Sequence, residues 1–438
     1  MSRVLHRVFA VICLFISLFA LANRGHAYSV LTHEELIDLL WSQSIKPLLL
    51  ERYPNATDDD LRQAHAYAYG GAVIQDLGYY PFGSHRFSDM VHYVRSGDFV
   101  AALIEQSTDL NGYAFALGAM AHYASDIKGH PAVNRSVAIQ YPKLEKKFGN
   151  HVTYEDDPEA HINTEFGFDV VQVAKNRYAP QSYHDFIGFK VDKDLLDRAF
   201  QQTYGVPANS VLKHEDLAIG SYRRAVSSFI PKLTKVALAT RGERMEREYP
   251  TFNRKKFLFH LSRADYERNW GKDYEHPGFG AKVAAFFLHL VPKVGPFRGL
   301  KYKDPTPQTE DLYFASVNHT IDYYRELADR VRKDHPSFAN MNLDTGKPSI
   351  AHEYPLADRT YAELLNVLHK DGIEKTTPEL RESILEFYAN APAPTDSREQ
   401  KQWQKVQQRL NELRTVKTTD NGETAPTSVE RCIDRCAE

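Results

Sequence analysis

The chain has 438 residues, of which 25% are charged and 42% are hydrophobic. Its formal net charge of −3 at pH 7 argues against a protein that binds duplex nucleic acid through bulk positive charge. Three cysteines in a chain of this length exclude a small disulfide-stabilised scaffold, so burial of apolar side chains must hold the core together.

The first 27 residues predict a signal peptide. They begin with two arginines, continue with an apolar run at 8–22, and end in the sequence Gly-His-Ala. The apolar run is too short to serve as a membrane anchor. Cleavage could follow Ala22 or Ala27. We therefore expect an exported protein, located in the periplasm or in the extracellular medium.

The rest of the chain contains few alternating, strand-like segments and predicts an all-α protein with many helices. The hydrophobic spacing and the capping signals predict helices over 28–50, 55–75, 99–106, 113–131, 159–176, 195–204, 217–240, 309–333, 361–369 and 397–417. We expect four parts: a signal peptide over 1–27, a main helical domain over 28–240, an additional helical region packed on it over 241–390, and a polar, partly disordered tail over 391–438.

The most hydrophobic run after the signal peptide is Val283–Pro292, which has ten residues. A membrane-spanning helix needs about 20 apolar residues. We therefore expect this run to pack in the core, and we predict no transmembrane segment in the mature chain.

The central stretch 113–131 combines an apolar helix with imidazole and carboxylate groups. His122 and Asp126 lie one turn apart on one face, and we expect Pro131 to end the helix with His130 at or just past its end. Polar groups in an apolar helix need a partner that compensates their lost hydration. A divalent metal is such a partner, and zinc suits this ligand set best.

The spacing by itself is not specific. A histidine is followed by an acidic residue four positions later in four places, at His85, His122, His151 and His161. With 19 histidines and 57 acidic residues, some of these pairs arise by chance, and each could be an exposed helical pair. The apolar setting of His122 and the other candidates around it favour a metal site.

Nine residues resemble, in order, spacing and type, the ligand set of the zinc-dependent phospholipase C family: Tyr28, His33, Asp76, His92, His122, Asp126, His130, His161 and Glu165. The single-strand-specific fungal and plant nucleases share the fold of this family. The resemblance covers roughly residues 28–170. It implies an all-α domain that holds three zinc ions in a cleft, and it makes 28–240 the catalytic domain.

The resemblance also implies which residues bind each zinc ion. One ion would be bound by Asp76, His92, His122 and Asp126. A second would share Asp126 and take His33 with the amino nitrogen and carbonyl group of Tyr28. The third would be bound by His130, His161 and Glu165. Because the first mature residue is a ligand in this family, cleavage after Ala27 is favoured.

Three positions depart from the family pattern. Tyr28 stands where the family usually has tryptophan, which is tolerable because the backbone groups bind the metal. His85 competes with His92 for one ligand position, and we prefer His92 because of its interval from the preceding acidic ligand. His151 competes with His161, and we prefer His161 because it lies on a predicted helix.

The resemblance implies a secreted zinc-dependent phosphodiesterase of phospholipase C type. Zinc lowers the pKa of bound water toward about 7, and the resulting hydroxide attacks the phosphorus of a phospholipid headgroup. Asp76 would act as general base as well as ligand. The partners implied are a phospholipid or another phosphodiester, together with peripheral contact with a membrane surface.

Two alternatives stay open. The same trinuclear zinc site could belong to a single-strand nuclease or nucleotidase, or the chain could be a non-catalytic helical module stabilised by zinc. The sequence leaves the oligomeric state and the role of residues 241–438 undecided.

Overall fold

The computed structural model describes residues 30–80, 82–174, 190–224, 303–333, 336–393 and 397–415. These residues are helical apart from turns, loops and one two-stranded antiparallel sheet, so the prediction of an all-α fold is confirmed. Among them, no helix is both long enough and apolar enough to cross a membrane. Several predicted features lie outside the described residues, among them the signal peptide 1–27, Tyr28, most of the predicted helix 217–240 and the apolar run Val283–Pro292.

The first half of the described chain forms a layer of helices around one long central helix. In chain order the elements are α2 (Val30–Leu40), a π-helical turn (Trp41–Ile45), α3 (Lys46–Arg52), α4 (Asp58–Ile74), a 3₁₀ helix (Gln75–Tyr79), α5 (His85–Tyr93), α6 (Ser96–Glu105), α7 (Leu110–Gln140), α8 (Pro142–Phe148) and α9 (Pro158–Ala174). After a gap follow α11 (Lys193–Tyr204), α12 (Ala208–Val211) and α13 (Glu215–Arg224).

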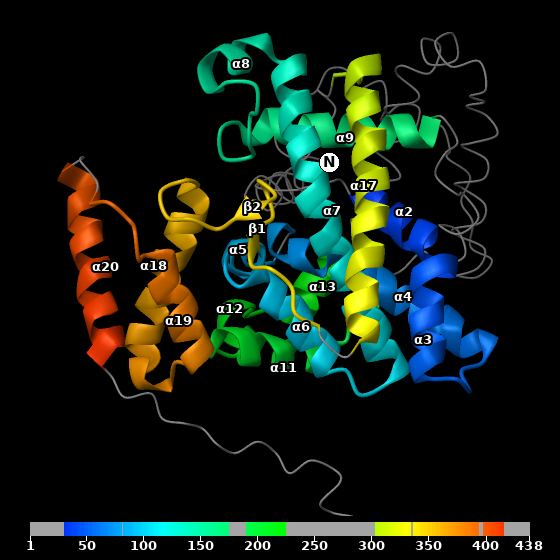
Figure 1. Ribbon diagram of the computed structural model, residues 1–438, viewed down its shortest axis with the longest axis horizontal. Coiled ribbons are helices and arrows are strands. Elements are labelled where there is room, and N and C mark those ends of the chain that lie inside the picture. The colour runs from blue at the N-terminus through cyan, green and yellow to red at the C-terminus, as the bar shows by residue number, and fades with distance from the viewer. Residues whose placement is uncertain are drawn as a thin grey trace, which may run out of the picture.

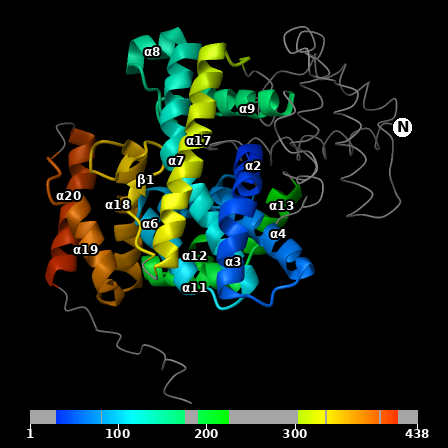
Figure 2. The ribbon, with the colours of Figure 1, turned by 45° about the vertical axis from the view of Figure 1, so that its right-hand side comes forward.

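The C-terminal part adds a long helix, a hairpin and a group of shorter helices. Its elements are α17 (Pro307–Arg332), β1 (Met341–Asn342), β2 (Lys347–Pro348), α18 (Pro355–Asp371), a 3₁₀ turn (Ile373–Lys375), α19 (Pro378–Phe387) and α20 (Ser397–Thr415). Figures 1 and 2 show α17 beside α7, with α18, α19 and α20 grouped on one side. The boundary expected at residue 240 lies outside the described residues, so the division into domains stays a prediction.

Helix α7 is the axis of the fold, and α4 and α17 make the most extensive contacts with it. Two glycines allow α4 and α7 to approach backbone to backbone. A Cβ on Gly71 would collide with the Phe115 carbonyl group, and a Cβ on Gly118 would collide with the Ala68 carbonyl group. The result is a close approach of the two helix backbones. It places the end of α4 directly against the face of α7 that carries His122.

The prediction that Pro131 ends the central helix is wrong, because α7 continues through Pro131 to Gln140. Proline removes one hydrogen bond to the carbonyl group four residues earlier, which belongs here to Ile127. The second half of α7 is held instead by packing, since Val133 and Val137 are buried in a cluster with side chains of α9 and α17. His130 consequently lies inside the helix, two turns beyond His122.

Side-chain caps mark the starts of the two helices that pack most closely. Thr57 and Asp60 form a capping box at the start of α4, and the Asp109 side chain accepts a hydrogen bond from the Gly112 N–H at the start of α7. Thr32 lies inside α2. Its hydroxyl group donates to Asp169 of α9 at 2.7 Å, so it ties two helices together.

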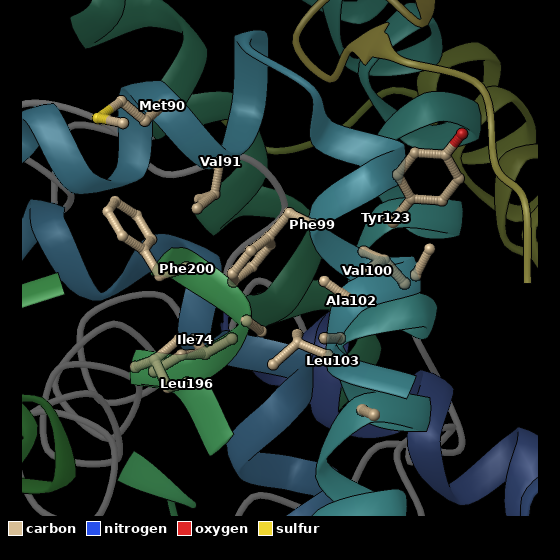
Figure 3. Close-up of a cluster of buried hydrophobic side chains, with 14 of the residues drawn as sticks. Ile74, Met90, Val91, Phe99, Val100, Ala102, Leu103, Tyr123, Leu196 and Phe200 are labelled. Carbon is tan, nitrogen blue, oxygen red and sulfur yellow. The ribbon is translucent and has the colours of Figure 1, made fainter. Parts of the chain in front are cut away.

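Aromatic side chains fill the space between α5, α6 and α11 (Figure 3). The Phe200 ring from α11 lies 5.5 Å from the Phe87 ring and 6.4 Å from the Phe99 ring, measured between centroids. All three side chains are fully buried. This packing fixes α5, and therefore His92, relative to the central helix.

Candidate metal centre

The structure gathers eight of the nine candidate ligands in the interior, where each is at most 1% exposed. The ninth, Tyr28, lies outside the described residues. The eight come from five elements: α2 supplies His33, the 3₁₀ helix supplies Asp76, α5 supplies His92, α7 supplies His122, Asp126 and His130, and α9 supplies His161 and Glu165. Spacings of four residues place the α7 ligands on one helical face.

Asp126 lies between two groups of imidazoles. Its Oδ2 atom is 3.1 Å from His122 Nε2 and 3.4 Å from His92 Nε2, whereas its Oδ1 atom is 3.7 Å from His33 Nε2. The His33 and His122 rings stack with centroids 4.3 Å apart. Asp76 completes the first group, with Oδ1 at 3.5 Å from His92 Nε2. Asp126 thus presents its two carboxylate oxygens to different imidazoles.

A third group of candidate ligands lies further along α7 and includes side chains of α9. His161 Nε2 is 2.8 Å from Glu165 Oε1, and His130 Nε2 is 3.9 Å from the same oxygen. Within the described part of the chain, three sets offer ligand atoms that lie within 4.8 Å of one another: His33, His122 and Asp126; Asp76, His92 and His122; and His130, His161 and Glu165.

Backbone carbonyl groups orient three of the imidazoles toward this centre. Each Nδ1–H donates to a carbonyl oxygen: His92 to Ser88 at 2.7 Å, His122 to Ala72 at 2.8 Å, and His130 to Leu343 at 2.6 Å. A carbonyl oxygen can only accept, so the proton is on Nδ1 and Nε2 presents its lone pair. This is how metal-binding histidines are usually held.

The buried atoms that face one another lack hydrogen bonds. Within the described residues, no hydrogen bond of acceptable geometry is made by Nε2 of His92, His122, His130 and His161 or by the carboxylate oxygens of Asp76, Asp126 and Glu165. Leaving a buried polar atom without a partner costs about 1–3 kcal/mol, and more for a charged group. A cation bound by these atoms would compensate that cost.

The pKa shifts of the candidate ligands also reflect their burial beside one another. Burial, together with the nearby carboxylates of Asp76 and Asp126, raises the pKa of Glu165 well above its usual value. Burial, helped by His130, holds the pKa of His161 well below its usual value, and burial with His122 lowers the pKa of His33 to about 3. At His92 and His122 burial would lower the pKa, but the carboxylates of Asp126 and Asp76 outweigh burial and raise both pKa values. Imidazoles together with carboxylates are a donor set that zinc prefers.

His85 and His151, the alternatives to His92 and His161, are not among these buried groups. His85 is partly exposed, and its ring packs 5.6 Å from the Tyr79 ring. His151 is exposed, with Nδ1 at 2.9 Å from Asn150 Oδ1. The structure thus brings His92 and His161 into the centre. Asp169, one turn beyond Glu165 on α9, accepts a hydrogen bond from the Thr32 hydroxyl group at 2.7 Å.

Sequence reasoning missed the contribution of the C-terminal part. The hairpin formed by β1 and β2 supplies the Leu343 carbonyl group that holds His130. A turn signal is present in the sequence at 342–348, which reads Asn-Leu-Asp-Thr-Gly-Lys-Pro. It predicts a turn, but nothing in it indicates that the turn reaches a site more than 200 residues earlier.

The fold and the site define a class: an all-α protein with a buried centre of imidazoles and carboxylates suited to several zinc ions. Residues 32–213 match the family model described as zinc dependent phospholipase C. The resemblance to this family is therefore confirmed over these residues, which include all eight described candidate ligands. No curated protein and no solved structure matches the chain.

Proposed function

We propose that this chain is an exported zinc-dependent phosphodiesterase of phospholipase C type that hydrolyses phospholipids at the headgroup phosphodiester. The family match supports zinc-dependent phospholipase C chemistry in general. The observation that carries the proposal is the placement of Asp126, whose two oxygens face different imidazoles while a further His₂Glu group lies along the same helix.

The residues assigned to each ion follow the three groups. Asp76, His92, His122 and Asp126 would hold one zinc ion, and Asp126 with His33 and the terminal Tyr28 would hold the second. His130, His161 and Glu165 would hold the third. When bound, the metal supplies an acidified water and positive charge for the phosphoryl oxygens.

We assign Asp76 the role of general base in this proposal. Burial alone would raise its pKa, but the imidazoles of His122 and His92 outweigh burial and lower it. The carboxylate therefore stays ionised and can accept the proton of an attacking water at Oδ1 or Oδ2. The 3₁₀ helix holds it in place, because Ser88 Oγ accepts from the Gly78 N–H at 2.9 Å.

The test is hydrolysis of a chromogenic phosphorylcholine ester by the processed protein. We expect turnover that a chelator abolishes and that zinc restores. Asp76→Asn should lower kcat by about 10²–10⁴-fold, the usual contribution of a general base. The matched control, Asp311→Asn, changes an exposed aspartate of α17 and should leave kcat unchanged.

Phospholipid vesicles and single-stranded DNA, offered separately, decide the substrate class. Release of a phosphorylated headgroup from vesicles supports the proposal. Cleavage of DNA without hydrolysis of vesicle lipids would instead support the nuclease alternative for the same metal centre. Zinc binding without turnover of either substrate would favour the non-catalytic module.

A further inference from the structure

A hairpin outside the family-matched region reaches the candidate metal centre. Residues 336–350, which include β1 and β2, pack against α5 and α6 (Figures 1 and 2). The match to the zinc-dependent phospholipase C model ends at residue 213, so this segment lies outside the matched residues. It forms hydrogen bonds with two of the candidate ligands.

The peptide groups of Leu343 join two of the metal-binding groups. The Leu343 N–H donates to the His92 carbonyl oxygen at 3.1 Å, and the Leu343 carbonyl oxygen accepts from His130 Nδ1 at 2.6 Å. His92 belongs to the first group and His130 to the third. A single residue of the hairpin therefore connects candidate ligands of two different metal ions.

The next residue, Asp344, adds a buried carboxylate to the same contact. Its Oδ2 atom accepts from the hydroxyl groups of Tyr93 at 2.8 Å and Tyr354 at 2.5 Å, and its Oδ1 atom lies 3.5 Å from His130 Nδ1. The residue is 4% exposed. Burial and the Asp344 charge hold the pKa of both tyrosines well above the usual value, so both keep the protons they donate.

The hairpin is anchored on both sides of this contact. Asn134 of α7 donates to the Asp344 carbonyl oxygen at 2.9 Å, and Ser96 of α6 donates to the Met341 carbonyl oxygen at 2.6 Å. Gly346 has a φ of 65°, and a Cβ there would collide with the Ile127 carbonyl group. That carbonyl group is the one that Pro131 leaves without its helical donor. The turn at Gly346 therefore packs against the point in α7 where Pro131 interrupts the helical hydrogen bonding, next to His130.

We propose that Asp344 is a positioning residue for the third metal site, an inference that rests on the zinc centre proposed above. Together with the Leu343 carbonyl group, Asp344 fixes the His130 ring with its proton on Nδ1 and its Nε2 lone pair toward His161 and Glu165. Partners behind a metal-binding imidazole fix its orientation; here the Leu343 carbonyl group takes the hydrogen bond, and the Asp344 carboxylate lies 3.5 Å from the same Nδ1 atom. The C-terminal region therefore completes the metal centre of the family-matched domain.

The test compares zinc affinity among variants of the full, processed chain. Asp344→Asn keeps the shape and an acceptor for the tyrosines but removes the charge behind His130. We expect one zinc ion per chain to bind about 10–100-fold more weakly in competition with a chelator of known affinity, the usual effect of losing such a partner. Asp311→Asn on the surface of α17 is the matched control and should bind like the wild type.

A second comparison separates positioning from a merely structural role. If Asp344 acts through His130, then Asp344→Asn should cause no further loss of zinc in a His130→Ala background. If Asp344 only stabilised the fold, Asp344→Asn would instead lower the unfolding temperature of the metal-free chain and reduce the affinity for all zinc ions together. Tyr354→Phe, which removes one hydrogen-bond donor to Asp344, should reduce the affinity for the same single zinc ion to a smaller extent. This variant replaces Asp344→Asn in the comparison if Asp344→Asn fails to fold.

The outcomes distinguish this inference from the proposed function. Wild-type zinc affinity in Asp344→Asn, or in Tyr354→Phe if the first variant does not fold, would overturn the inference and leave the zinc phosphodiesterase intact. Additive loss in the His130→Ala background would also overturn it. Absence of zinc from the wild-type chain would overturn both.

Discussion

At the scale of single residues, Asp126 determines how the metal centre is built. Its Oδ1 atom faces His33, and its Oδ2 atom faces His92 and His122. Glu165, by contrast, contacts only the two imidazoles of its own group within the described residues. Both carboxylates are buried, but Asp126 faces imidazoles of two groups and Glu165 faces imidazoles of one.

This difference gives a prediction for zinc stoichiometry. Asp126→Asn should remove two zinc ions per chain, because the bridging carboxylate serves two groups, whereas Glu165→Gln should remove one. Metal analysis of the purified variants after dialysis measures both. Equal losses in the two variants would contradict a bridging role for Asp126.

At the scale of elements, α7 carries three candidate ligands and packs directly on α4. The apolar pattern of 113–131 was sufficient to predict a buried central helix. The end of that helix was not predictable, because the residues that hold its second half come from α9 and α17. Local preference disfavours a helix through Pro131, and distant packing overrides that preference.

The backbone contact between α4 and α7 gives a second prediction. Gly118→Ala should lower the free energy of unfolding by about 1–3 kcal/mol, because its Cβ would meet the Ala68 carbonyl group and push the helices apart. Gly220→Ala is the matched control in α13, where a Cβ would meet nothing within 4 Å. This change should raise the free energy of unfolding by about 0.4–1 kcal/mol.

Urea denaturation of both variants measures these two effects. Opposite signs for the same chemical change would show that packing against Ala68, and not helix preference, decides the outcome at Gly118. Two values of the same sign would contradict the close approach of α4 and α7.

At the scale of the whole molecule, the metal centre joins parts of the chain that are distant in sequence. Ligands come from α2, the 3₁₀ helix, α5, α7 and α9, and the hairpin of residues 336–350 closes the centre from the C-terminal side. The candidate ligands themselves could be chosen from the sequence because they resemble, in order, spacing and type, the ligand set of the zinc-dependent phospholipase C family; spacing alone was not specific. The role of the hairpin could not, because Leu343 contributes a backbone carbonyl group, which leaves no trace in residue type.

A centre of this kind should stabilise the fold. Without a cation, imidazole nitrogens and carboxylate oxygens of the centre are buried with no hydrogen-bond partner within the described residues, and leaving buried polar atoms without partners is costly. We predict that a chelator lowers the unfolding temperature and that zinc restores it. Each ion present at about 100-fold above its Kd contributes about 2.7 kcal/mol. An unfolding temperature that does not respond to chelator would contradict the prediction.

The measurement that tests the central claim most directly is the zinc content of protein exported and processed to its natural N-terminus, with that terminus sequenced on the same sample. The three ligand groups predict about three zinc ions per chain and Tyr28 as the first residue. A content near zero or one on properly processed protein would contradict the trinuclear centre and favour a structural role for the cluster.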